Sequence, residues 1–354
     1  LGLLMAAFFL VGAWLPSASN GLFASPDETA TAVMAKGIAM YGQASRTEPL
    51  ATQIPWLHPR SWVSAGAKIV PVGFLGFPML LSVVVFLGGA FLLPWLGLIL
   101  MMSAIYPVFR LFARRFSEQE ALIGTSLLFF FPTVILYANR GLFATGPQLA
   151  CLAWWLFLVG RTRKPEQSPW RTVLVSVLEG MLTMVVLFIR PVEALWLLPW
   201  MGWWLQRTPR TWSLLERLAV STGAVVFFVF YILVVTRTYG NPLAIGYLLR
   251  DNVALPLPGV VSTVASRPEA RAFFWEQFLP YGFHPRHIWW NIHSFTAEIL
   301  WPWLFALIVA FAMLVRIPVI RQAWRTRFSQ TTFRVTGLIP VFLSVWTILV
   351  LGVI

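Results

Sequence analysis

Residues 69–89 read IVPVGFLGFPMLLSVVVFLGG, an apolar run without a single charged side chain. A helix of about 20 apolar residues matches the hydrocarbon core of a bilayer, and several other runs in the chain approach or exceed that length. The whole chain is 58% hydrophobic and 11% charged, whereas soluble proteins carry roughly 25% charged residues. The composition therefore predicts an all-α polytopic membrane protein.

We expect about nine transmembrane spans, together with interfacial helices in the first outer loop. The predicted spans lie near residues 1–15, 92–113, 119–138, 147–160, 172–189, 192–206, 218–236, 295–315 and 337–354. Residues 1–354 then form a single transmembrane domain. Because the chain lacks an initiator Met and stops inside an apolar run at Ile354, we expect either a fragment or a numbering that starts inside the natural protein.

The direction of the spans follows from the basic residues, which gather between the apolar runs. Cytoplasmic loops carry an excess of Lys and Arg, so clusters that recur after every second span indicate the cytoplasmic side. Four such clusters lie within residues 110–115, 161–171, 207–217 and 316–334. They explain the net charge of +13 as a feature of a membrane protein, so we expect membrane lipid and no nucleic acid as a partner.

The topology depends on whether residues 69–89 cross the membrane. Four residues that disfavour a regular helix interrupt this run, namely Pro71, Gly73, Gly76 and Pro78. They favour an interfacial or re-entrant segment that does not cross, which places residues 16–68 and 237–294 outside as two large extracytoplasmic loops. If the run does cross, residues 16–68 are cytoplasmic instead.

The first outer loop contains SPDETATAVMAKGIAMYG at residues 25–42. Ser25 fits an N-cap, Pro26 the first helical position and Glu28 the acid of a capping box. The following helix carries its apolar residues at a spacing of three or four, on a face formed by Ala30, Val33, Met34, Ile38 and Tyr41. Such an amphipathic helix would lie on the membrane surface, with the adjacent acids Asp27 and Glu28 in its first turn.

Several chemistries are disfavoured by what the sequence lacks. It contains no P-loop, no Asp-x-Asp and no Gly-x-Ser-x-Gly motif. Few ionisable residues lie inside the predicted spans, which argues against ion transport. His284, His287 and His293 have a spacing that suits a metal, but no Cys or Asp stands nearby, so we expect no cofactor and find no support for a divalent metal.

What remains is a pair of carboxylates, scattered Arg residues and many aromatic side chains on one side of a membrane. Transfer of a sugar from a lipid phosphate needs these parts. A carboxylate takes the proton of an acceptor hydroxyl, Arg neutralises the departing phosphate, and aromatic rings hold the sugar. The sequence therefore favours such a transfer over the other enzymatic classes.

A series of short motifs occurs in order along the chain. They are PDE at residues 26–28, GFPML at 76–80, the pair Arg114-Arg115, the pair Arg190-Pro191, GNPLAIGY at 240–247 and LPYGFHPRHIWWNIHSFTAEILWPW at 279–303. In this order the motifs resemble the GT-C superfamily of polyprenyl-phosphate-sugar glycosyltransferases. The most similar branch is glycosyltransferase family 39, which holds protein O-mannosyltransferases and bacterial lipid A aminoarabinose transferases.

The resemblance implies a GT-C-type helix bundle in the bacterial cytoplasmic membrane, with its active site on the extracytoplasmic face. It implies an inverting transferase of the hexosyl or pentosyl class that uses a polyprenyl-phosphate sugar as donor and a protein, lipid or glycan as acceptor. Asp27 is then the general base, and Glu28 supports it. Candidate contacts to the donor phosphate are Arg140, Arg190 and Arg286, and candidate contacts to sugar or acceptor are Asn139, Tyr247 and Trp289.

The sequence departs from the family pattern in the second outer loop, where members commonly carry an acid. Here residues 139–146 read NRGLFATG, so either Asn139 or Arg140 contacts phosphate or sugar instead, or the site is degraded. Two alternatives from other classes stay open. A transporter or flippase of lipid-linked glycans would move a similar lipid without chemistry, and a non-catalytic membrane subunit would only bind the acceptor.

Overall fold

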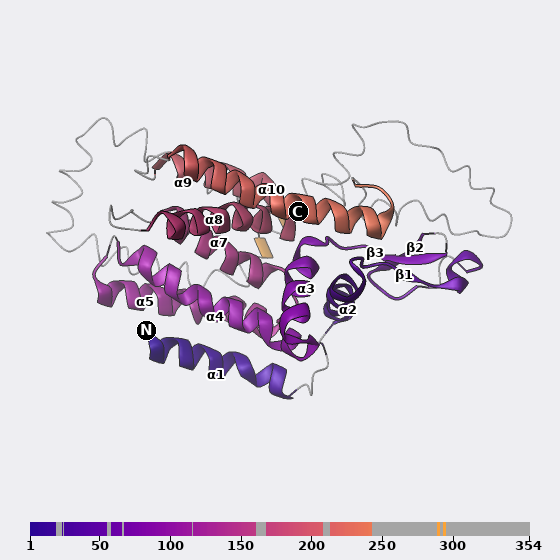
Figure 1. Cartoon of the computed structure of the whole chain (residues 1–354). Helices are drawn as coiled ribbons and strands as arrows, with labels where there is room; N and C mark the ends of the chain where they lie inside the picture. The colour runs from indigo at the N-terminus through magenta and orange to yellow at the C-terminus, as the bar shows by residue number, and fades with distance from the viewer. Residues whose placement is uncertain are drawn as a thin grey trace. The chain divides into compact units, whose positions relative to one another are not determined.

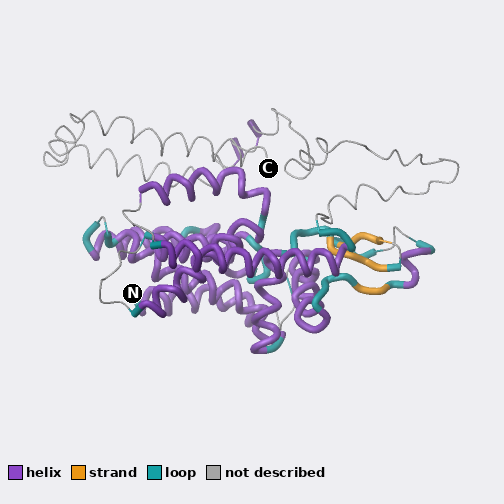
Figure 2. Tube along the Cα trace, turned by 45° about the horizontal axis from the view of Figure 1, so that its top comes forward, coloured by secondary structure: helices purple, strands orange, loops and turns teal. Residues whose placement is uncertain are grey.

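The computed structural model describes residues 1–18, 23, 25–54, 58–65, 67–114, 116–160, 168–207, 213–242, 289–290 and 293–294. The chain divides into two compact units. The first contains Leu1–Pro191 and Trp204–Pro268, and the second contains Val192–Trp203 and Glu269–Ile354. The helices and strands below belong to the first unit, except that most of α9 belongs to the second (Figures 1 and 2).

Helices make up most of the described chain. They are α1 (Gly2–Ala18), α2 (Pro26–Tyr41), α3 (Gly76–Gly88), α4 (Leu93–Phe112), α5 (Glu118–Phe129), α6 (Pro132–Asn139), α7 (Thr145–Val159), α8 (Pro169–Ile189), α9 (Ala194–Arg207) and α10 (Leu214–Tyr239). Short 3₁₀ turns cover Pro49–Thr52, Ala90–Leu92 and Pro191–Glu193. Three strands follow α2, namely β1 (Arg46–Thr47), β2 (Trp62–Ala65) and β3 (Lys68–Pro71).

Three helices of the described residues are long and apolar enough to cross a membrane: Ala90–Phe112, Pro169–Ile189 and Leu214–Tyr239. The pair α5 and α6 would form a fourth span, although it bends by 61° where Pro132 begins α6. The helices α1 and α7 are apolar but shorter. The mostly helical fold is thus confirmed, and the length and composition of these helices are consistent with a membrane protein, while the total of about nine spans stays a prediction. Its last two members, 295–315 and 337–354, lie outside the described residues.

A small antiparallel sheet with the strand order β1-β3-β2 differs from the all-α prediction. Val63 of β2 pairs with Val70 of β3, and both are buried together with Val72 against Tyr239 of α10. The residues next to these valines, Trp62 and Ser64 of β2 and Pro71 of β3, are buried as well, so this part of the sheet is covered on both faces. The sequence does not reveal β3, because its last residues open the apolar run at 69–89, whose composition favours an interfacial or re-entrant segment.

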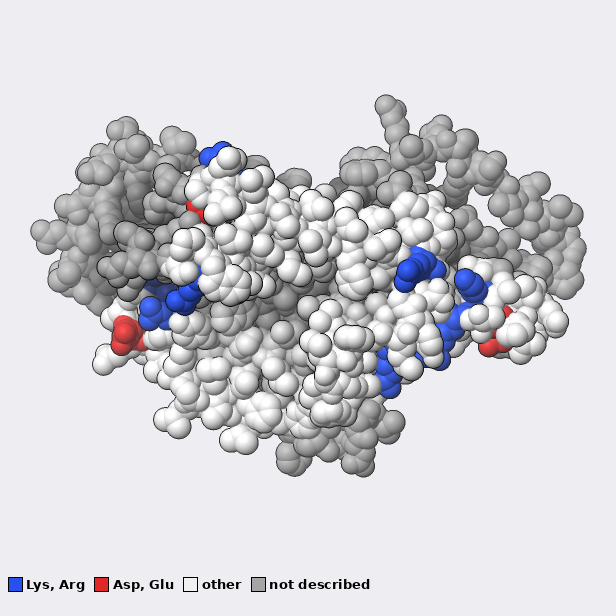
Figure 3. All heavy atoms as spheres, in the orientation of Figure 1, with Lys and Arg blue, Asp and Glu red and all other residues white. Residues whose placement is uncertain are grey.

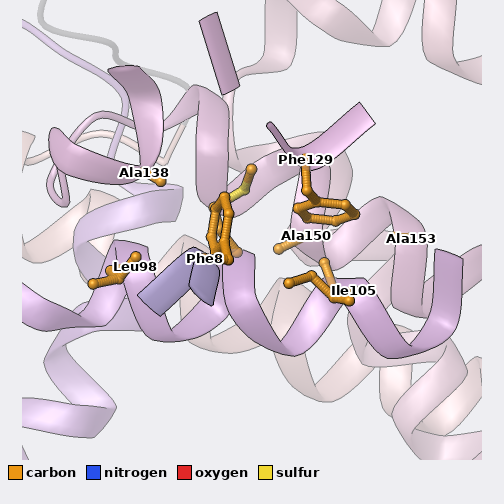
Figure 4. Close-up of a cluster of buried hydrophobic side chains, with 9 residues drawn as sticks. Phe8, Leu98, Ile105, Phe129, Ala138, Ala150 and Ala153 are labelled. Carbon is orange, nitrogen blue, oxygen red and sulfur yellow. The ribbon is translucent and has the colours of Figure 1, made fainter. Parts of the chain in front are cut away.

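The core of the bundle lies where five helices meet (Figure 4). It contains Phe8 of α1, Ile105 of α4, Phe129 of α5, Ala138 of α6 and Ala150 of α7. The rings of Phe8 and Phe129 lie edge to face, with centroids 5.6 Å apart. Such aromatic pairs contribute beyond their buried area, so α1 is held to the bundle by a specific contact.

Hydrogen bonds between residues at helix ends show which helix ends lie together. Arg114, which follows α4, donates to the carbonyl oxygen of Gly160 after α7 at 2.7 Å. Burial and then the neighbouring charge of Arg110 lower the pKa of Arg114. At the other end, Arg190 after α8 donates to Thr145 at the start of α7. The bundle therefore has one end at which both α4 and α7 finish. At its opposite end, α7 begins and α8 finishes.

The segment that contains α2 and the three strands packs on this second end. Thr238 near the end of α10 accepts a hydrogen bond from the backbone N–H of Ala44 at 3.0 Å, and Tyr239 donates to the carbonyl oxygen of Pro71 at 3.0 Å. Gly76 at the start of α3 lies directly on the backbone of Phe188 at the end of α8.

Figure 3 shows basic side chains in two groups, one at each end of the bundle, with an uncharged surface between them.

The crossing of α8 and α10 depends on two glycines. A Cβ at Gly180 would overlap the carbonyl oxygen of Val220, and a Cβ at Gly223 would overlap that of Val177. Small residues allow helix backbones to approach closely inside membranes, where no water drives association. We expect Gly180→Ala and Gly223→Ala each to lower the free energy of unfolding by about 1–3 kcal/mol, as overpacked cores do.

Thermal unfolding of the detergent-solubilised chain measures this effect. The control is Gly2→Ala, because a Cβ at Gly2 meets no atom within 4 Å. Equal unfolding midpoints for Gly180→Ala and Gly2→Ala would contradict the close crossing.

Candidate functional site

The first turn of α2 begins at the predicted N-cap, Ser25, but the predicted capping box is half formed, because the Glu28 carboxylate contacts the Ser25 hydroxyl in place of its backbone N–H. Ser25 has extended backbone angles, and its hydroxyl accepts a hydrogen bond from the backbone N–H of Glu28 at 3.3 Å. Pro26 occupies the first helical turn, where its missing N–H costs nothing. At the other end Gly42 caps the helix with a φ of 68°. Most of the predicted apolar face is buried, but Tyr41 is 68% exposed.

The two adjacent acids of this turn have opposite environments. Glu28 is 3% exposed, and its carboxylate forms an ion pair with the guanidinium of Arg140 at 3.5 Å. The Ser25 hydroxyl also donates to this carboxylate at 3.3 Å. Asp27, in contrast, is exposed, and its carboxylate accepts a hydrogen bond from the hydroxyl of Ser61. The carboxylate of Glu28 therefore holds Arg140 inside the protein, whereas Asp27 is exposed to solvent.

Arg140 lies in the short connection between α6 and α7. Its guanidinium stacks on the ring of Phe143, with Cζ 4.0 Å from the centroid. Within the part of the chain that the structure describes, its Nε atom and the Oδ1 atom of Asn139 are buried without a hydrogen-bond partner. Buried polar atoms without partners are rare in proteins, so this connection leaves one donor and one acceptor unsatisfied.

Arg190 is the cap residue at the end of α8, and its NH1 group donates to the Thr145 hydroxyl at 3.2 Å. Because Thr145 begins α7 and Arg140 precedes α7, both guanidinium groups flank the same connection. The structure thus brings four of the predicted residues to one end of the bundle around one connection: Glu28, Asn139, Arg140 and Arg190. Asp27 adjoins them through Glu28.

The other predicted site residues are not brought together with these. Tyr247 and Arg286 lie outside the described residues, as do His284 and His287. Trp289 is described as part of the second unit, where its ring is 69% exposed. Among the described residues, no group of three His, Cys, Asp or Glu side chains converges in a way that could hold a metal.

Sequence reasoning missed Ser61, which contacts the predicted base directly. Asp27 and Ser61 are separated by 34 positions, and no motif joins them.

Comparison of the chain with protein-family models, with curated proteins and with solved structures finds no match.

The ion pair between Glu28 and Arg140 predicts a specific pattern of stability. Glu28→Ala removes a buried partner and leaves the half-buried guanidinium unpaired, so we expect a loss of about 1–3 kcal/mol in the free energy of unfolding. Adding Arg140→Met to that variant should recover part of the loss, because an apolar pair avoids the cost of a buried charge.

Chemical denaturation of the single and double variants measures this coupling. The matched control is Glu118→Ala, an exposed acid in the first turn of α5, for which we expect little change. Strictly additive effects of the two substitutions would show that the pair does not interact.

Proposed function

We propose that this chain is a membrane glycosyltransferase that moves a sugar from a polyprenyl-phosphate donor to an acceptor hydroxyl on the extracytoplasmic face. The observation that supports it best is the division of roles in the first turn of α2. An exposed carboxylate, Asp27, stands next to a buried one, Glu28, that fixes a guanidinium at the same end of the bundle. A candidate base and the residue that holds a candidate anion-binding group are thus neighbours in one helical turn.

The proposed reaction is a single displacement. The carboxylate of Asp27 takes the proton of the acceptor hydroxyl, and the acceptor oxygen attacks the anomeric carbon of the donor sugar. The bond between that carbon and the phosphate oxygen breaks as the new bond forms on the opposite face, so the anomeric configuration inverts. The electron pair of the broken bond leaves with the polyprenyl phosphate.

The departing phosphate gains negative charge, and fixed positive groups lower the energy of that step. Arg140 and Arg190 flank the α6–α7 connection and are the candidate partners among the described residues. Arg140 is preorganised, because Glu28 holds its terminal nitrogen and Phe143 lies against its plane. An Arg fork can bind two oxygens of one phosphate, which suits this role.

The geometry of α3 supports an extracytoplasmic site. Its first residue, Gly76, lies on the end of α8, and its last residues lead through Ala90–Leu92 into the start of α4. Both ends of α3 therefore adjoin the same end of the bundle, opposite to Arg110 and Arg114. With the cytoplasmic side assigned to the basic clusters, Asp27 faces outward.

The base is tested by Asp27→Asn, which keeps the shape of the side chain and removes its basicity. Release of polyprenyl phosphate is measured for the full chain in vesicles with a panel of polyprenyl-phosphate hexoses and pentoses. We expect the variant to lose at least about a hundredfold in turnover, since general bases contribute factors of this size. Its thermal unfolding should match that of the unsubstituted chain, because Asp27 is exposed.

Glu48→Gln is the control for this experiment. Glu48 is an acid of the same outer segment, and its carboxylate caps Pro49–Thr52 through the N–H of Leu50. It should retain turnover. Full activity of Asp27→Asn, or no consumption of any donor in the panel, would contradict the proposal.

The sidedness has its own test by cysteine labelling in sealed cells. Cys151 is the single cysteine of the chain and is buried in α7, so Cys151→Ala provides an unreactive background. In that background we expect Thr47→Cys in β1 to react with an impermeant maleimide from outside, and Glu118→Cys to react only after lysis, because both positions are exposed. The reverse pattern would place the site in the cytoplasm.

A further inference from the structure

A tight turn precedes β2 and contains an unusual residue. The backbone N–H of Trp62 donates to the carbonyl oxygen of Pro59 at 3.1 Å, which closes a four-residue β-turn. Ser61, the third residue of this turn, has a φ of 70° and is the single residue other than glycine with a positive φ in the described parts of the chain. Because Arg60 before it keeps a negative φ, the turn is of type II.

The third position of a type II turn is normally glycine or asparagine, because a Cβ is strained at positive φ. The neighbouring hairpin imposes this conformation on Ser61. Its carbonyl oxygen accepts a hydrogen bond from the N–H of Val72 at 3.0 Å, which extends the pairing of β2 with β3 by one residue. Glycine would meet every backbone requirement here, so the backbone does not explain a serine.

The side chain does explain it. The Ser61 hydroxyl donates a hydrogen bond to Oδ1 of Asp27 in the first turn of α2. Asp27 contributes its backbone carbonyl oxygen to the Thr31 hydroxyl at 2.8 Å, which fixes the helix but not the carboxylate. Strained residues cluster at functional sites, where the surrounding structure maintains them.

We propose that Ser61 is a positioning residue for the carboxylate of Asp27, an inference that rests on the proposed function and deepens it. The hydroxyl occupies Oδ1 and thereby directs Oδ2 toward the acceptor hydroxyl. When the acceptor proton moves to Oδ2, the hydrogen bond from Ser61 to Oδ1 is retained. The strained turn keeps the hydroxyl in place, because the carbonyl oxygen of the same residue is anchored in the sheet.

Two substitutions separate this role from a structural one. Ser61→Ala removes the hydroxyl and keeps a strained Cβ, whereas Ser61→Gly removes the hydroxyl and relieves the strain. If the hydroxyl positions the base, both variants lose kcat to a similar extent, about tenfold to a hundredfold, with KM for the donor unchanged. Their unfolding midpoints should differ, with Ser61→Gly the more stable of the two.

The measurement is steady-state turnover of a polyprenyl-phosphate sugar by the full chain in vesicles, beside thermal unfolding of the same preparations. Turnover that follows stability, with Ser61→Gly as active as the unsubstituted chain, would overturn the positioning role. An active Asp27→Asn, or a chain that turns over no donor, would overturn the proposed function instead. A loss of kcat in both Ser61 variants together with an inactive Asp27→Asn supports the inference.

Discussion

An ion pair between the buried carboxylate of Glu28 and the half-buried guanidinium of Arg140 joins α2 to the helix bundle. Moving two charges out of water is costly, and their attraction repays that cost only when the geometry is good, so such a pair adds more to specificity than to stability. Here its effect is to align α2 with the connection between α6 and α7. The Ser25 hydroxyl, which caps α2 and also contacts Glu28, ties the start of the helix to the same point. Every candidate role near this end of the bundle depends on that alignment.

The sheet and the residues after α2 contact the end of α10 through hydrogen bonds that involve no buried charge. Thr238 and Tyr239, at the end of α10, bind backbone groups of Ala44 and Pro71, and thus connect α10 both to the residues after α2 and to the sheet. Two features of the structure meet at Gly42. Its φ of 68° caps α2, and a Cβ at this position would overlap the guanidinium of Arg237. The left-handed φ is the feature that favours glycine here, because the flexible Arg237 side chain can move away from a Cβ.

Local patterns predicted the parts of this arrangement that local chemistry determines. Ser25, Pro26 and Glu28 marked the start of α2, and uniform apolar runs marked α8 and α10. Pro132 could have predicted the break between α5 and α6, because proline removes a helical hydrogen bond. The short strands and the burial of Glu28 could not be predicted from the sequence, because both depend on partners far away along the chain. Ser61 is the extreme case, because neither its positive φ nor its contact with Asp27 leaves a mark in the neighbouring residues.

The adjacent acids acquire different roles from the geometry of the helix itself. Consecutive residues on an α-helix point about 100° apart, so one acid of a pair can face the protein while its neighbour faces outward. At the start of α2 this rotation places Glu28 against Arg140 and Asp27 against the exposed turn that contains Ser61. Each carboxylate is then oriented by a different element, one by the bundle and one by the sheet. A shift of the sheet relative to the bundle would therefore move the proposed base away from the guanidinium groups without breaking the helix that carries it.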